Sequence, residues 1–179
     1  MPPLRSDAAR SRERILAAAA DGDRAGLRLN DVARAAGVGV GTVYRHFPTV
    51  DALVEALASG TVQRALDCAR AALLAEDAGA AFDDFLSTML DLLLSDDGLQ
   101  HVLLAADDSS TQVGAAKAEL TRSAATLLDR AQRAGAVRAE VTLEQLMHLV
   151  CGIEHAIRLG TPADRGTLTA VLRAGLRPG

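Results

Sequence analysis

Aromatic residues are scarce in this chain of 179 residues, which has no tryptophan, one tyrosine and three phenylalanines. Cysteine is nearly absent as well, and Cys68 and Cys151 are too few and too far apart for a disulfide scaffold or a zinc ribbon. No apolar run reaches the ~18 residues that span a bilayer, and the charged N-terminus lacks the apolar stretch of a signal peptide. We therefore expect a globular protein of the cytoplasm with no membrane partner.

The net charge of −4 at first argues against a nucleic-acid partner, but the charges are distributed unevenly along the chain. Residues 1–48 hold eight arginines, no lysine and five acids, a balance of +3, so residues 49–179 carry −7. A basic end joined to an acidic body is typical of a chain whose one end meets a polyanion. Chance unevenness in a short segment is the alternative interpretation.

Alanine and leucine dominate the sequence, and it has no period-two runs of β-branched or aromatic residues. The sequence therefore predicts an all-α fold of nine helices. The first helix is expected to follow Ser6 and to end near Ala20. Thr49 is placed to cap a long fourth helix, Thr142 and Gln145 fit a capping box, and Thr161-Pro162 fits the start of the last helix.

Two short predicted helices joined by a glycine turn occupy residues 29–47. This is the order of a helix-turn-helix, whose second helix enters the major groove of DNA with its first residues against the base edges. Small residues at positions 40–42 allow close approach to the groove. Tyr44, the one tyrosine, is followed by Arg45 and His46, and all three side chains can donate hydrogen bonds to phosphates or bases.

Residues 10–58 resemble the DNA-binding domain of TetR-type transcriptional repressors. The most specific part is AGV at positions 36–38, GTVY at 41–44 and HFP at 46–48, followed by Leu53. The resemblance implies that the residues contacting DNA are Val40, Gly41, Thr42, Tyr44, Arg45, His46 and Thr49. It implies turn and core roles for Gly37, Val38, Val43 and Phe47.

Two positions depart from the family pattern. Gly39 stands where many members have a serine that caps the recognition helix, a loss of a few tenths of a kcal/mol. Val50 stands where many members have lysine or arginine, and one phosphate contact fewer makes the salt dependence of log K shallower by about one unit. An adaptor that has lost DNA binding is therefore an open alternative.

The resemblance divides the chain into a basic N-terminal arm (1–9), a DNA-binding domain (10–58, with the helix-turn-helix at about 28–47) and a ligand-sensing and dimerisation domain (59–179). The C-terminal stretch is similar to the regulatory domain of an actinobacterial-type branch of the family. In such proteins the last two long helices pair with their symmetry mates. The apolar residues expected in this interface are Leu146, Leu149, Val150, Ile153, Ile157, Leu168, Val171 and Leu172. A monomeric bundle is the alternative.

The middle helices are expected to enclose an aliphatic, methionine-lined pocket for an apolar small-molecule effector, with no other cofactor. The expected lining residues are Phe82, Phe85, Met89, His101, Val102, Leu103, Met147 and Cys151. For each of them, membership of an ordinary core is the alternative interpretation.

His148, Cys151 and His155 share one face of a predicted helix, which raises the question of a metal site. The two histidines lie about 10 Å apart along the helix axis, so we expect no metal there. The sequence also has no phosphate loop, zinc-hydrolase motif or serine nucleophile elbow. We expect a ligand-responsive repressor that binds a palindromic operator as a homodimer and is not an enzyme; a small helical enzyme or metal carrier is the alternative.

Overall fold

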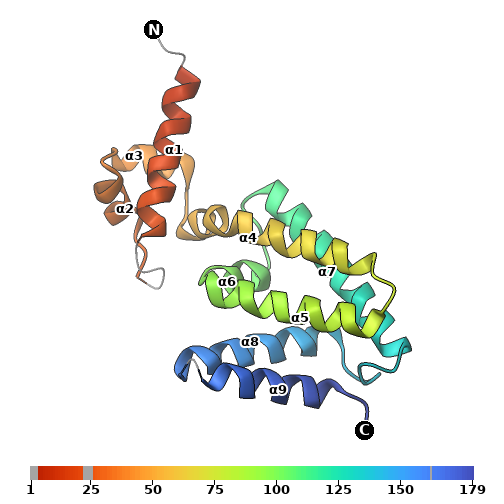
Figure 1. The fold of residues 1–179 in the computed structure, drawn as a ribbon. Helices are drawn as coiled ribbons and strands as arrows, with labels where there is room; N and C mark the ends of the chain where they lie inside the picture. Colours follow the sequence, from red (N-terminus) through yellow and green to blue (C-terminus); the bar gives the residue numbers. More distant parts are fainter. Residues whose placement is uncertain (1–3, 22–25, 162) are drawn as a thin grey trace.

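The computed structural model describes residues 4–21, 26–161 and 163–179, and within these ranges it has nine helices and no strand (Figure 1). The helices are α1 (Leu4–Ala20), α2 (Leu29–Ala36), α3 (Val40–His46), α4 (Val50–Leu73), α5 (Ala78–Ser95), α6 (Leu99–Leu104), α7 (Thr111–Arg133), α8 (Leu143–Leu159) and α9 (Asp164–Leu176). The predicted all-α fold is confirmed.

The molecule has two hydrophobic cores that meet on α4. The first core joins α1–α3 to the first turn of α4, and we call this part the head; the second core joins the rest of α4 to α5–α9, which we call the body. Leu53 is fully buried in the head core, while its neighbour Val54 is buried in the body core. Val50 packs against both cores. The expected domain boundary at residue 58 thus lies within a helix that head and body share.

The body is a layered bundle in which α4 packs against α5 and α7, α5 packs against α8, and α9 lies along α8 (Figure 1). Short α6 bridges α4 and α5 on the side that faces the head. In the part of the chain that the structure describes, none of the helices combines the length and apolar character needed to cross a bilayer.

Three predicted helix ends are confirmed. Gly37 ends α2 in the left-handed conformation, with φ of 62°. The Thr49 hydroxyl oxygen accepts the Ala52 N–H at 3.0 Å at the start of α4. The capping box of α8 is complete, because Thr142 and Gln145 each accept the backbone N–H of the other, at 3.2 and 3.0 Å.

Two predicted helix starts are wrong. Helix α1 begins at Leu4, not after Ser6, so much of the expected N-terminal arm is helical; residues 1–3 lie outside the described residues. Helix α9 begins at Asp164, later than predicted, and Thr161 does not cap it. The Thr161 N–H and hydroxyl instead donate to the Asp164 carboxylate, at 2.7 and 2.9 Å. Pro162, the expected first-turn proline, lies outside the described residues.

Candidate nucleic-acid interface

The turn between α2 and α3 requires the glycine at position 37. Its φ of 62° is a conformation that residues with a side chain rarely adopt. A Cβ atom there would also lie 2.8 Å from the Arg14 guanidinium, which donates to the Gly37 carbonyl oxygen at 3.1 Å. Helix α1 therefore holds the turn directly, and this fixes the angle between α2 and α3.

Helix α3 is anchored by its buried face and presents the opposite face to solvent. Val43 is fully buried and Phe47 is 2% exposed, both in the head core, and Val38 packs against the same core. Val40 and Tyr44 are 44% and 48% exposed despite their apolar character. A short helix with small and hydrogen-bonding residues on its exposed face has the geometry for reading a major groove.

Tyr44 and Thr49 line one shallow groove beside α3, together with Arg28. The N-terminus of the 24-residue helix α4 lies at this groove. Its first backbone N–H groups have no partner within the helix. The helix dipole adds partial positive charge at this end. A phosphate group fits this combination of two hydroxyls, a guanidinium and a helix N-terminus. Arg28 was not among the predicted site residues.

The other predicted contact residues lie on different parts of the same surface. Gly41 and Arg45 are exposed on α3, while Thr42 and His46 are half-buried. The His46 ring lies 6.2 Å from that of Phe47 and lines a cleft between head and body. The Arg12 guanidinium lies in the same cleft, 5.5 Å above the Phe47 ring. Tyr44 and His46 thus face two different grooves.

The arginines of the head are not equally available to a phosphate. Arg10 pairs with Asp7, and Arg34 pairs with Asp31 at 3.2 Å. Arg28 and Arg45 have no acidic partner among the described residues. Arg45 lies on the recognition helix and Arg28 directly precedes α2, so both exposed cations lie on the side of the head where the motif expects DNA.

The two departures from the family pattern have clear structural consequences. Gly39 is the N-cap residue of α3, and no side chain caps the helix there. Val50 is half-buried between the two cores, so its side chain joins head to body and offers no charge to a phosphate. The backbone N–H groups at the start of α4 are unaffected by this substitution.

The body contains an apolar cavity of about 90 Å³ between α5, α6, α7 and α8. Of the eight residues predicted to line a pocket, five surround it: Phe85, Met89, Leu103, Met147 and Cys151. Phe82 and Val102 are buried in the body core, and His101 is exposed and bonds to Asp51 at 3.0 Å; none of these three lines the cavity. The polar side chains in its wall are those of Thr121 and Cys151.

The three residues considered for a metal site do not converge. His148 and His155 are exposed, whereas Cys151 is half-buried against the cavity. Burial raises the pKa of the Cys151 thiol, and the nearby Glu154 carboxylate raises it further. Within the described residues, no group of three or more histidine, cysteine or acidic side chains has the geometry to hold a metal ion.

The residues expected in a dimer interface divide by burial. Leu146, Val150 and Leu172 are buried in the body core of a single chain. Leu149 and Val171 are 46% and 60% exposed. Ile153, Ile157 and Leu168 are half-buried. The outer face of α8 and α9 also carries small exposed residues: Gly152, Ala170, Ala174 and Gly175.

Comparisons with known proteins identify both halves of the chain. Residues 15–57 match the N-terminal domain of bacterial regulatory proteins of the tetR family. Residues 77–178, more than half of the chain, match the C-terminal domain of SbtR-like transcriptional regulators. No curated protein matches the sequence at a significant level.

Solved structures of related proteins cover nearly the whole chain. A TetR regulatory protein from Mycobacterium vanbaalenii is 38% identical, with 98% of this chain and 100% of that one covered and a TM-score of 0.48. The TetR regulator SCO0520 from Streptomyces coelicolor is 28% identical (93% and 98% covered, TM-score 0.55). FadR from Bacillus subtilis, solved with stearoyl-CoA, shares the fold at 15% identity (94% and 99% covered, TM-score 0.54). The chain belongs to the TetR family of DNA-binding transcriptional regulators.

Proposed function

We propose that this regulator is a homodimeric repressor that binds a palindromic operator and releases it when a small apolar effector enters the body. The observation that carries the proposal is the apolar cavity, whose wall has no charged side chain. Transferring a charged group into such a site is strongly unfavourable, so the effector is uncharged where it lies in the cavity. Leu103 and Leu104 of α6 are part of the wall, and α6 also contacts α4, the helix that enters the head.

The size of the cavity restricts the effector. A 150 Å³ cavity lined by aliphatic and aromatic residues admits benzene, so a cavity of about 90 Å³ holds only a few heavy atoms unless its wall moves. Leu104, 46% exposed, stands at the rim and is the side chain that a longer ligand displaces first. The structure of FadR from Bacillus subtilis holds stearoyl-CoA, so straight-chain acyl compounds and alcohols are the first ligands to test.

The exposed apolar face of α8 and α9 supports the proposed dimer. Leu149, Leu159 and Val171 are between 46% and 77% exposed on these two helices. Exposed apolar residues that gather on neighbouring helices mark an interaction surface. The small residues between them allow the helices of two copies to approach closely. A two-fold dimer presents its two recognition helices to major grooves about 34–36 Å apart, which is the spacing of operator half-sites.

The proposal assigns the chain no catalytic role and places it in the cytoplasm, where operator DNA is accessible. Its family consists of transcriptional regulators, which supports this assignment. Histidine, cysteine and acidic side chains of the described residues are not gathered into a group that suits metal chemistry. A chain that had become an adaptor would fail the DNA-binding experiment below.

The experiment measures binding to the DNA upstream of the regulator's own gene by fluorescence anisotropy at low salt. We expect specific binding by the dimer, weakening on addition of straight-chain alcohols or fatty acids, and loss of specific binding in Tyr44→Ala. Equal, weak binding of the wild type and Tyr44→Ala would overturn the proposed DNA-binding role. Binding that no apolar compound weakens would overturn the proposed effector class.

A further inference from the structure

A buried carboxylate joins α4 to the N-terminus of α7. Glu55 is 6% exposed, and its two carboxylate oxygens accept the backbone N–H groups of Ser109 and Ser110, at 2.6 and 2.7 Å. Helix α7 begins directly after Ser110 and has 23 residues, so its dipole adds to the attraction for a negative charge. Glu55 lies on α4 just beyond Leu53, which belongs to the head core. The contact therefore fixes the head end of α4 to the body.

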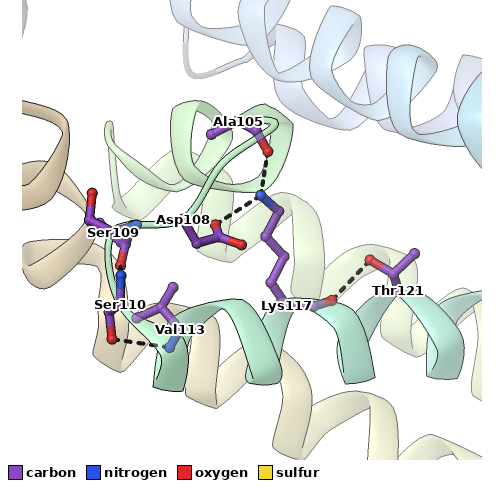
Figure 2. Close-up of polar contacts among 8 residues, drawn as sticks. Ala105, Asp108, Ser109, Ser110, Val113, Lys117 and Thr121 are labelled. Atoms are coloured by element: carbon purple, nitrogen blue, oxygen red, sulfur yellow. Dashed lines mark hydrogen bonds and ion pairs between the residues drawn. The ribbon is translucent and has the colours of Figure 1, made fainter.

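The segment that Glu55 binds is the α6–α7 loop (residues 105–110), and a second charged residue holds this loop from the other side. Lys117 on α7 donates to the carbonyl oxygen of Ala105 and to the carboxylate of Asp108, the latter at 3.0 Å (Figure 2). Its side chain is only 15% exposed. Lys117 is the only lysine in the sequence. Apart from the histidines, all other basic residues are arginines.

The loop packs closely on α7 because a glycine faces it. A Cβ atom at Gly114 would lie 3.0 Å from the Asp108 carboxylate, tighter than an ordinary contact. Ala105 also ends α6, so the Lys117 ammonium sits at the C-terminus of that helix, where positive charge is favoured. The loop is thus held at both ends by charge-assisted hydrogen bonds, which are stronger than neutral ones.

Lys117 lies one helical turn from a residue of the cavity wall, and the loop that Glu55 binds follows two others. Leu103 and Leu104 line the cavity and directly precede the loop. Thr121 also lines the cavity, and its hydroxyl donates to the Lys117 backbone carbonyl at 2.9 Å (Figure 2). A ligand that moves the end of α6 must therefore move the Ala105 carbonyl relative to the Lys117 ammonium.

We propose that Glu55 and Lys117 are positioning residues for DNA binding: Lys117 holds the α6–α7 loop on α7, and Glu55 holds the head end of α4 on that loop. The inference deepens the proposed function and rests on it, because it specifies how the state of the cavity reaches the recognition helix. Neither residue lines the cavity. With both contacts intact, the head has one orientation and binds an operator half-site without first being ordered.

The test uses Glu55→Gln and Lys117→Met. Glutamine keeps the size of the side chain but has only one acceptor oxygen, so its amide NH₂ faces one of the two N–H groups of the loop. Methionine keeps most of the length of lysine and removes the ammonium. The control is Asp77→Asn, which removes the negative charge from a side-chain cap at another helix start, that of α5 (Ala80 N–H to Asp77, 3.0 Å). Figure 1 places that helix start at the far end of α4 from the head.

The first measurement needs neither DNA nor effector. Spin labels on Ala35→Cys in α2 and Ala118→Cys in α7, both exposed positions, report the distance from head to body in a background without Cys68 and Cys151. Dilution with unlabelled protein keeps each measured pair within one chain. We expect a narrow distance distribution in the parent and in Asp77→Asn, and a broad one in both test variants. A narrow distribution in folded Glu55→Gln and Lys117→Met overturns the inference.

The second measurement is affinity for the regulator's own upstream DNA. Loss of a hydrogen bond to a charged group is expected to weaken specific binding about tenfold in either test variant, with the salt dependence unchanged because no phosphate contact is lost. Unchanged affinity in both variants overturns the inference. If the head-to-body distance broadens as expected while the wild type binds no operator, the two contacts do fix the head on the body, but the proposed function fails.

The single lysine gives a third readout, which reports local opening of the loop. In the native protein the Lys117 amine is protected by Ala105 and Asp108, so its acetylation by acetic anhydride, followed by mass spectrometry, reports whether the loop is held. We expect acetylation to be about tenfold faster in Glu55→Gln than in Asp77→Asn when both are folded. Equal rates in the two variants mean that the loop is held without Glu55 and contradict the inference.

Discussion

At the scale of single residues, Gly37 is one of two glycines with positive φ among the described residues, and the one of the two at which a Cβ atom would meet a neighbour. Alanine at φ of 62° carries a penalty of about 1–2 kcal/mol, and its methyl group would also displace the Arg14 guanidinium. We expect Gly37→Ala to lower the free energy of unfolding by about that amount, measured by urea denaturation. The matched control is Gly60→Ala in α4, where a Cβ meets nothing within 4 Å.

The control is informative because its expected sign is opposite. Alanine in a helix interior is about 0.5–1 kcal/mol more stable than glycine, so Gly60→Ala should raise the free energy of unfolding. If Gly37→Ala were as stable as the wild type, the turn would not depend on its left-handed conformation. The account of how α1 holds the turn would then be wrong.

Cys151 differs from an ordinary thiol because of its surroundings. Burial raises its pKa, and Glu154 raises it further, so the fraction of reactive thiolate at a given pH is lower than for a free thiol. We expect iodoacetamide to alkylate Cys151 slowly at pH 8, with a half-maximal rate at a pH above the ~8.5 of a free cysteine. Peptide mass spectrometry measures the rate, and the chain unfolded in urea is the reference.

A compound that enters the cavity should slow this alkylation further, because the thiol lies in the cavity wall. Alkylation of native Cys151 as fast as in the unfolded chain would contradict its burial. The same labelling experiment therefore identifies ligands without any knowledge of the operator.

At the scale of helices, α3 is the recognition helix and begins without a side-chain cap. Gly39 has φ of −65° and ψ of 142°, a conformation open to any residue, and a Cβ there would lie 3.8 Å from the Thr42 hydroxyl. We expect Gly39→Ser to raise the free energy of unfolding by a few tenths of a kcal/mol, because serine caps better than glycine. Gly39→Ala is the paired variant and should be less stable than the wild type, since alanine caps poorly.

Urea denaturation of the two variants gives the order serine, glycine, alanine if the missing cap limits α3. Equal stability of the serine and alanine variants would show that the end of α3 is fixed by packing alone. Operator affinity should follow the same order, because a better-formed recognition helix needs less ordering on the DNA.

The helices differ in how far their ends could be predicted. Gly37, Thr49 and Thr142 act on backbone groups at most a few residues away, so local sequence was enough to place them. The start of α9 differs from the prediction, which takes Thr161 as the cap and Pro162 as the first-turn residue, whereas Thr161 donates to the Asp164 carboxylate and the helix begins at Asp164. Helix ends that are fixed by hydrogen bonds between neighbouring residues can therefore be predicted from the sequence, provided that the acceptor is identified correctly.

Contacts across the chain were not predictable in the same way. Glu55 and Ser109 are 54 positions apart, and Arg14 and Gly37 are 23 apart. One signal for Glu55 was present: an acid between the buried residues Val54 and Ala58 stands out on an otherwise apolar face. Its partner lies in a loop with no motif, so the pairing required the three-dimensional structure.

At the scale of the whole molecule, one face of α8 and α9 decides whether two heads act together. Val171 is 60% exposed on that face, and aspartate there would place a charge in the proposed interface. We expect Val171→Asp to be a folded monomer in analytical ultracentrifugation. Because a dimer binds its second half-site as an intramolecular step, operator affinity should fall roughly 100-fold or more.

Leu74→Asp is the matched control, since Leu74 is 86% exposed and ends α4 outside the face formed by α8 and α9. It places the same charge on an exposed leucine and should leave both the dimer and the operator affinity unchanged. A dimeric Val171→Asp would move the interface away from this face. A monomeric Val171→Asp with full operator affinity would mean that one head suffices, and the palindromic operator would lose its physical basis. Whether the protein binds DNA as a monomer or as a dimer also determines how much positive charge reaches the DNA. A single head carries the +3 of residues 1–48. A dimer brings two such heads to the DNA, with the acidic bodies on the side away from it.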